Sequence, residues 1–325
     1  MAHVEPRTDV PLRALPVERV ADDGGLTLRR GCTMVRIDGE HAGGLVGIVL
    51  ELTSGADRTE DELVALFPPE AQEPIRSLVR ELRARRLLLP VDAVEDAADE
   101  SPLDVFYWHF GRPEEPSPSP PRDELVAVAG RSTTAVRLGG LLREAGFDEI
   151  AEVDAPDALG DLAPAVLAAV SENGFGPLRA WNEVALERGL PFLPVAIENL
   201  VAYVGPLVLP HETACLECLL RRRYSNLDEA AAREPVELRP DGAEIVGLHP
   251  AIAAVAAGAA SLELSRFFLP WSGAEQAGYV ITFNLLSGRS GRRRVLKVPR
   301  CPACSSLRAR QPTATIRASL TGDGV

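Results

Sequence analysis

The chain has 325 residues, a formal net charge of −13 at pH 7, and 46% hydrophobic residues. This length suits two domains or one large one, and the apolar content is enough to form buried cores. The acidic balance argues against a nucleic-acid partner, because phosphates would be repelled. The first residues form no apolar signal segment, and no stretch is long and apolar enough to span a bilayer, so we expect a cytoplasmic protein with no membrane partner.

The first ninety residues begin with short strand-like runs. Residues 25–30 and 33–38 mix β-branched and polar residues on either side of Gly31-Cys32, which predicts a β-hairpin. Residues 17–23 are a candidate for a third strand. The apolar run at 44–52 ends before a glycine, as is typical of a helix.

Two further helices are predicted after this run. Thr59 and Glu62 have the spacing of a capping box, which starts a short helix that ends at two prolines. The apolar residues of the next helix recur at helical spacing: Ile75, Leu78, Val79 and Leu82. A basic stripe runs beside them, formed by Arg76, Arg80 and Arg83. These arginines are either a solvated face or part of a binding surface.

Strands followed by three helices, the last amphipathic and basic, predict a small winged helix-turn-helix domain over residues 1–91. Two functions suit that shape. The last helix could read a DNA groove. An acidic peptide could instead add a strand to the exposed hairpin edge and lie against the basic helix.

The pattern of this domain resembles the PqqD-like peptide-recognition domains of ribosomal peptide biosynthesis. The resemblance rests on GLTLRRGCTMVRIDG, the apolar helix ending in TSG, RTEDELVALF and the arginine-rich last helix. In that family a leader peptide pairs with the third strand, against the last helix. The resemblance implies these leader-binding positions: Thr33, Met34, Val35, Arg36, Ile37, Ile75, Arg76, Val79, Arg80 and Arg83.

Residues 92–123 have the composition of a linker. Their two ends are rich in acidic residues, alanine, proline and serine, and such segments bury too little apolar surface to fold alone. Between these ends lies an aromatic stretch at 103–110, although aromatic residues make up only 5% of the chain. We expect this stretch to dock onto one of the two domains as a helix.

Residues 124–325 begin like a nucleotide-binding domain. A buried strand ends at Gly130, a helix follows, and a second strand ends at Asp154. The phosphate loop is degenerate, because Ser132 and Ala135 stand where a G-x-G-x-x-G loop has glycines that let phosphate approach the backbone. We therefore expect ATP to bind weakly or not at all.

Strands and helices alternate along the rest of this domain. Further strands are predicted at 163–170, 191–197 and 201–209, helices at 178–188 and 250–268, and a last hairpin at 279–284 and 292–298. This alternation predicts an α/β domain with a Rossmann-like, mostly parallel, doubly wound sheet. The small residues of the 250–268 helix suit close packing against the sheet or a second subunit.

Four of the five cysteines form two C-x-x-C pairs, which are Cys215 with Cys218 and Cys301 with Cys304. Two such pairs complete a tetrahedral thiolate site, so the spacing predicts a structural zinc ion that joins distant segments. A redox dithiol would explain one pair but not the second, and two disulfides would need an oxidising compartment.

Other polar clusters have more ordinary interpretations. His211-Glu212 precedes the first cysteine pair and is expected to make loop hydrogen bonds. The basic runs 221–223 and 292–294 are solvated faces or, as a second interpretation, docking surfaces.

The domain over 124–325 resembles the ThiF and ubiquitin-activating enzyme superfamily. The resemblance rests on the strand–glycine–helix start, on GLPFLPVAIENLVAYVGPLVLPHETACLECL, on the small-residue helix and on CPAC. Members adenylate a carboxylate with ATP and often dimerise through this domain, which implies a possible homodimer. The degenerate loop, and the lack of a free cysteine for a thioester in this domain, argue against adenylation here.

Two kinds of protein join a PqqD-like module to a ThiF-like one. One is the leader-binding partner of YcaO-type cyclodehydratases, which form azolines in thiazole/oxazole-modified peptides (TOMM). The other is a microcin-type, ATP-dependent peptide adenylyltransferase. The degenerate loop favours the first, a non-catalytic protein of bacteriocin-like peptide biosynthesis that presents a precursor peptide to its partner enzyme. A zinc-stabilised DNA-binding regulator is the remaining alternative.

Overall fold

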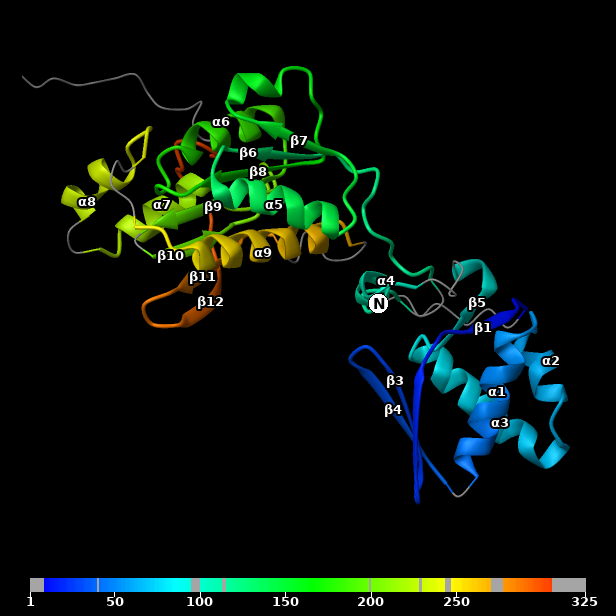
Figure 1. Ribbon diagram of the computed structural model, residues 1–325. Coiled ribbons are helices and arrows are strands. Elements are labelled where there is room, and N and C mark those ends of the chain that lie inside the picture. Colours follow the sequence, from blue (N-terminus) through cyan, green and yellow to red (C-terminus); the bar gives the residue numbers. More distant parts are fainter. Residues whose placement is uncertain are drawn as a thin grey trace, which may run out of the picture. The chain divides into compact units, whose positions relative to one another are not determined.

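The structure is a computed structural model that describes residues 9–39, 41–94, 100–112, 115–198, 200–227, 230–242, 247–269 and 277–305. The outer ends of both predicted domains and parts of the predicted linker lie outside these residues. The chain forms two compact units, Met1–Pro120 and Pro121–Val325, and each is described by itself (Figure 1). Every helix in the described ranges is too short or too polar to cross a membrane.

The first unit has two small sheets. Strands β2 (Glu18–Asp22), β3 (Gly25–Arg30) and β4 (Thr33–Asp38) form an antiparallel sheet in that order, which confirms the predicted hairpin and its third strand. Strand β4 is an edge strand of this described sheet. Strands β1 (Leu12–Ala14) and β5 (Leu88–Pro90) pair separately.

Three helices cover this sheet and form the core of the unit with it. They are α1 (Ala42–Ser54), α2 (Glu60–Ala65) and α3 (Pro69–Ala84), followed by a 3-10 turn, η1 (Val91–Ala93). Helix α2 begins at the predicted capping box, in which Thr59 and Glu62 satisfy each other's backbone amides. Buried apolar side chains from β3, β4, α1 and α3 pack together, including Leu28, Val49 and Val79.

The basic stripe of α3 is neutralised within the chain. The Arg83 guanidinium is buried and its Nη1 lies 2.9 Å from Glu60 Oε2, which is also buried. Arg76 pairs with Asp61 at 2.8 Å and Arg80 with Glu73 at 3.0 Å. The expectation that these arginines form one stripe beside the apolar face is therefore wrong for Arg83, because its side chain points into the core towards α2.

The aromatic stretch docks as helix α4 (Pro102–Trp108) within the first unit, as expected. Trp108 is buried, its Nε1 donates to the carbonyl of Arg86 at 3.2 Å, and the Arg30 guanidinium lies 4.7 Å from its ring centre. The guanidinium of Arg86 donates onward to the carbonyl of Glu115 at 3.1 Å and to Ser117 Oγ at 2.9 Å. Part of the predicted linker is therefore held by two buried arginines.

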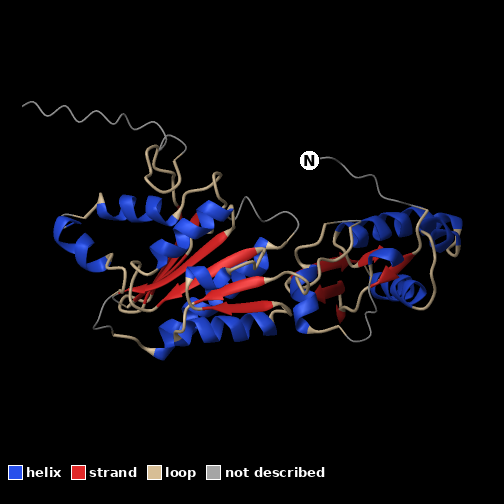
Figure 2. Ribbon diagram, turned by 90° about the horizontal axis from the view of Figure 1, so that it is seen from above, coloured by secondary structure: helices blue, strands red, loops and turns tan. Residues whose placement is uncertain are grey.

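The second unit has one seven-stranded sheet in the order β12-β11-β10-β9-β8-β6-β7 (Figure 2). The strands are β6 (Val126–Ala129), β7 (Ile150–Val153), β8 (Val166–Ser171), β9 (Phe192–Glu198), β10 (Val201–Val204), β11 (Tyr279–Asn284) and β12 (Arg289–Arg294). Strands β6 to β9 pair in parallel, whereas β10, β11 and β12 join antiparallel. The prediction of a mostly parallel sheet is therefore wrong: the sheet is mixed, because β10, β11 and β12 each run antiparallel to their neighbour. Strand β9 reverses directly into β10 and β11 into β12, whereas the long connection from β10 to β11 contains helices.

Helices cover both faces of this sheet. Helices α5 (Thr133–Glu144) and α9 (Pro250–Phe267) share an apolar layer with one face, and α6 (Leu178–Arg188) and α7 (Leu216–Tyr224) share one with the other. A 3-10 turn, η3 (Pro156–Leu159), and helix α8 (Ala230–Glu237) complete the unit. The small residues of α9 pack against the sheet and α5. Packing against the sheet was one of the two arrangements predicted for this helix, the other being packing against a second subunit.

The last strand differs from its prediction by a few residues. It covers Arg289–Arg294 and not 292–298, because Gly288 takes a φ of 65° and closes the hairpin there. The residues that follow leave the sheet and approach the cysteine pair at 301–304.

We predict that Glu60→Ala lowers the free energy of unfolding by about 3 kcal/mol, because it leaves the buried Arg83 guanidinium without its carboxylate. Urea unfolding measures this change. Asp61→Ala removes an exposed partner of Arg76 and is the matched control, with an expected loss of about 0.5 kcal/mol. Equal losses in both variants would contradict a structural role for the buried pair.

Candidate functional site

Four cysteine sulfurs meet inside the second unit. Cys215 Sγ lies 3.9 Å from Cys218 Sγ and 3.7 Å from Cys301 Sγ, and Cys218 Sγ lies 3.5 Å from Cys304 Sγ. All four ligand atoms lie within 4.8 Å of one another, and all four residues are buried. No other such cluster is found among the described residues.

These distances fit a tetrahedral metal site. Four sulfurs at the usual zinc–sulfur bond length of about 2.3 Å would be separated by about 3.8 Å. Four buried thiols without a metal would instead place polarisable, weakly hydrogen-bonding groups against each other. The four cysteines could thus bind a metal ion, and zinc is the ion that a four-thiolate set favours.

The local structure explains how the two pairs reach each other. Cys215 is the N-terminal capping residue of α7 and Cys218 lies in its first turn. The backbone amide of Val298 donates to Cys218 Sγ at 3.4 Å, and Arg222 of α7 donates to the carbonyl of Leu296 at 2.6 Å. These bonds hold the segment after β12 against α7. A backbone amide that donates a hydrogen bond to the sulfur is also a usual outer-shell support of a thiolate ligand.

His211 lies in the loop before this site. It has a φ of 68°, its side chain is exposed, and its carbonyl accepts from Lys297 Nζ at 2.7 Å. It is not part of the sulfur cluster, in keeping with the loop role expected for it.

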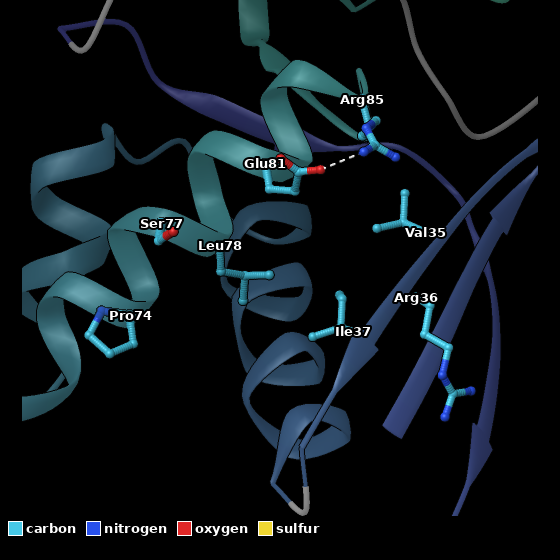
Figure 3. A pocket seen from close by; sticks show the side chains of 8 residues that line it. All are labelled: Val35, Arg36, Ile37, Pro74, Ser77, Leu78, Glu81 and Arg85. Atoms are coloured by element: carbon cyan, nitrogen blue, oxygen red, sulfur yellow. Dashed lines mark ion pairs between the residues drawn. The ribbon is translucent and has the colours of Figure 1, made fainter. Parts of the chain in front are cut away.

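A groove of about 540 Å³ lies in the first unit between the edge strand β4 and helix α3. Val35, Ile37 and Leu78 point towards one another across it, and an ion pair between Glu81 and Arg85 lies at one end (Figure 3). The atoms of that pair are 2.8 Å apart. The groove therefore joins an apolar floor to the free backbone edge of a strand.

The predicted leader-binding residues divide into two groups around this groove. Val35, Arg36 and Ile37 line it, and Thr33 and Met34 belong to the same edge strand. On α3, Ile75, Val79 and Arg83 are buried in the core, and Arg76 and Arg80 do not line the groove. The helix residues that do so are Pro74, Ser77, Leu78, Glu81 and Arg85.

The degenerate nucleotide loop follows β6. Gly130 has a φ of 117°, and a Cβ there would lie 2.6 Å from the carbonyl oxygen of Val170, so glycine is required for the backbone itself. Ser132 is the N-terminal cap of α5 and accepts from the amide of Ala135 at 3.2 Å. The Asp154 carboxylate is paired with Arg131, which holds the pKa of Asp154 below its ordinary value.

A carboxylate of the chain itself occupies the start of α5. Glu172 Oε1 accepts from the backbone amide of Thr134 at 2.7 Å and from its hydroxyl at 2.6 Å. The first turn of a helix after a glycine loop is where an α/β nucleotide site holds phosphate. Two first-turn amides of α5, those of Thr134 and Ala135, are thus already used by Glu172 and Ser132.

Two kinds of solved structure share this fold. The heterocyclase TruD superposes with a TM-score of 0.64 at 21% identity, over 91% of this chain and 43% of its own. A heterocyclase in complex with substrate and cofactor gives 0.64 at 19% identity, over 91% and 40%. MccB of E. coli gives 0.62 at 12% identity, over 91% of this chain and 97% of its own.

At these identities the likeness is one of fold. The chain spans less than half the length of the two heterocyclase structures and nearly all of MccB. No protein-family model matches the chain, and no curated protein matches it by sequence.

Sequence reasoning missed two features of these sites. The first is Glu172, which directly follows the end of β8. An acidic residue just after a buried strand was the sequence signal that could have placed a carboxylate at this edge of the sheet. The groove residues of α3 recur at helical spacing, as do the buried ones, but their stripe starts one residue earlier, at Pro74. The apolar stripe alone could not tell a core face from a groove face.

We predict that Cys218→Ser loses bound zinc and lowers the midpoint of thermal unfolding, because three thiolates and a hydroxyl hold zinc poorly and the ion joins two segments. Zinc content by atomic emission and a thermal melt measure both effects. Cys32→Ser is the matched control, since Cys32 is the one cysteine outside the cluster. Full stability of zinc-free Cys218→Ser would contradict a structural metal.

Proposed function

We propose that this chain is the leader-peptide-binding partner of a YcaO-type cyclodehydratase, a protein that captures a ribosomally made precursor peptide and presents it for azoline formation. The observation that carries the proposal is the groove between the edge strand β4 and helix α3. An edge strand offers unpaired backbone donors and acceptors, and a peptide that pairs with them gains affinity independent of its sequence.

The lining of the groove supplies selectivity for such a peptide. Side chains of an added strand alternate between its two faces, and the inward ones would meet the apolar floor formed by Val35, Ile37 and Leu78. At one end they would meet the exposed ion pair of Glu81 and Arg85. The favoured peptide is therefore extended, with apolar side chains at alternate positions.

The two kinds of fold neighbour support a peptide substrate. One heterocyclase structure is a complex with substrate and cofactor, and MccB has been solved in complex with MccA. This chain spans 43% of the TruD heterocyclase. We propose that a YcaO-type partner enzyme modifies the captured peptide. Capture of the leader would then raise the effective concentration of the core peptide at that enzyme.

The start of α5 supports a role without ATP chemistry of its own. A phosphate there would displace Glu172 from Thr134 and would meet side chains at positions 131 and 132 in place of a glycine backbone. The like charge of the Glu172 carboxylate would also repel it. We infer that the second unit is a scaffold in which the four cysteines hold zinc.

A peptide adenylyltransferase is the second candidate. It is favoured by MccB, which matches this chain over almost its whole length and has been solved with ATP. The loop at 130–135 argues against it, for the reasons above. A DNA-binding regulator loses its main support, because the arginines of α3 are paired with carboxylates of the chain.

We predict that Leu78→Glu weakens binding of the cognate leader at least tenfold, because a carboxylate would enter the apolar floor of the groove. Fluorescence anisotropy with labelled leader peptides of candidate precursors measures this. Leu66→Glu is the matched control, since Leu66 is exposed and does not line the groove. Unchanged affinity in Leu78→Glu would contradict the groove assignment.

Arg80→Glu distinguishes the binding surface predicted from the sequence from the groove found in the structure. The sequence-based expectation gives Arg80 a place in that surface, whereas the structure puts it outside the groove. Leader affinity that falls with Arg80→Glu and not with Leu78→Glu would favour the original surface.

We predict no detectable binding of magnesium-ATP to the zinc-loaded protein in titration calorimetry, because the phosphate donors of α5 are occupied by Glu172. Binding in the micromolar range would show that the loop still accepts phosphate. In that case, release of pyrophosphate with a precursor peptide would establish the adenylyltransferase as the function.

A further inference from the structure

The edge strand β12 of the second unit carries an unusual concentration of positive charge. Four of its six residues are arginines, at positions 289, 292, 293 and 294, and all four are exposed. The strand lies at the end of the described seven-stranded sheet, beyond β11. The chain as a whole carries a net charge of −13, so the charge of this strand is opposite in sign to that of the whole chain.

The other arginine run of this unit is used internally. Arg221 pairs with Glu217 at 3.2 Å, Arg222 donates to carbonyls after β12, and Arg223 is paired with Glu198 and Glu237. In the described residues, by contrast, Arg289, Arg293 and Arg294 form no ion pair. Arg292 lies over the ring of Tyr279, 3.9 Å from its centre. The positive charge of Arg289, Arg293 and Arg294 is therefore open to an outside partner.

The backbone of β12 has a free side as well. The amide of Val295 donates inward to Gly278 at 2.8 Å, and on β11 the amide of Leu285 donates away from β12, to Leu200, at 3.1 Å. Because ladder bonds alternate along an antiparallel strand, the amides of residues 293, 291 and 289 face β11. The amides and carbonyls of Ser290 and Arg294 therefore face away from the sheet.

We propose that β12 is a docking edge for an acidic, extended segment of a protein partner, which adds to the sheet as a further strand. Backbone bonds at Ser290 and Arg294 would position the segment, and carboxylates at its alternate residues, which share one face, would meet Arg289 and Arg293. The exposed leucines at the hairpin turn, Leu285 and Leu286, add an apolar contact next to this edge. The surface is separate from the leader groove and does not depend on it.

Charge decides between this occupant and others. A second copy of β12 would place arginines opposite arginines, which is destabilising for directly opposed strands. A nucleic acid would be repelled by the rest of the chain and would not use the outward amides in register. A further interpretation is that the arginines only protect the edge from non-specific strand pairing. It predicts that β12 has no affinity for any peptide.

The test uses the full-length, zinc-loaded protein and a fluorescein-labelled probe, acetyl-Val-Glu-Val-Glu-Val-Glu-amide, read by anisotropy. Binding is expected, with slower amide exchange at Ser290 and Arg294. Ser290→Pro removes one outward amide without changing charge or the β11 ladder, and should weaken the probe at least tenfold. Ser290→Ala is its control and should bind within twofold of the unmodified chain.

A second pair of variants tests the charge. Replacing Arg289, Arg293 and Arg294 together by Glu should abolish binding, whereas the same change at Arg122, Arg143 and Arg188, on other surfaces, should not. Leu78→Glu should leave the probe unaffected, which distinguishes this edge from the leader groove. Failure of the proposed leader function would thus leave this result unchanged.

Four outcomes would overturn the proposal. They are no binding of the acidic probe, equal binding to Ser290→Pro, equal binding of single-stranded DNA, and self-association in sedimentation that Ser290→Pro abolishes. The first supports the guarding interpretation, the second a charged surface without strand addition, the third a nucleic-acid surface and the fourth a second copy of the chain.

Discussion

The second unit depends on four buried sulfurs that bring the start of α7 to the segment after β12. These two segments are far apart in the sequence. The ladder of β10, β11 and β12 alone would hold the end of β12, the last strand of the described residues, only from one side. The sulfur cluster, with the bonds from Arg222 and to Cys218 Sγ, fixes it from the other. Burial of four sulfurs is stable when a metal neutralises their thiolates, so the cluster and the packing around it support one another.

At the start of α5, backbone amides are satisfied by side chains of the chain itself. Around α5 the chain supplies its own anion, Glu172, to donors that a nucleotide would need, and Asp154 is paired with Arg131. A helix whose first backbone amides are hydrogen-bonded by side chains of the same chain gains stability. It loses affinity for outside anions, since the same amides cannot serve both.

Pairing of arginines decides which surfaces of this acidic protein can attract a partner. Arg83 is buried with Glu60, and the half-buried Arg223 is paired with Glu198 and Glu237, so these charges are neutralised within the fold. The first unit is left with a groove that is apolar at its floor, whereas β12 keeps its positive charge. The peptides proposed for these two edges differ accordingly, one selected by apolar side chains and the other by acidic ones.

The sequence by itself determined the local elements and the metal-binding pattern. The hairpin, the capping box at Thr59, the helix over Leu178–Arg188 and the two C-x-x-C pairs all follow from interactions within a few residues, which a sequence pattern records directly. The fold shared with the heterocyclase and MccB also agrees with the resemblance of the second domain. Tertiary structure alone decided which face of α3 meets β4, since adjacent helical residues differ by about 100° and both stripes are regular. It also decided the direction of β10 to β12, the pairing of each arginine and the place of Glu172, because these depend on residues that meet only after the chain has folded.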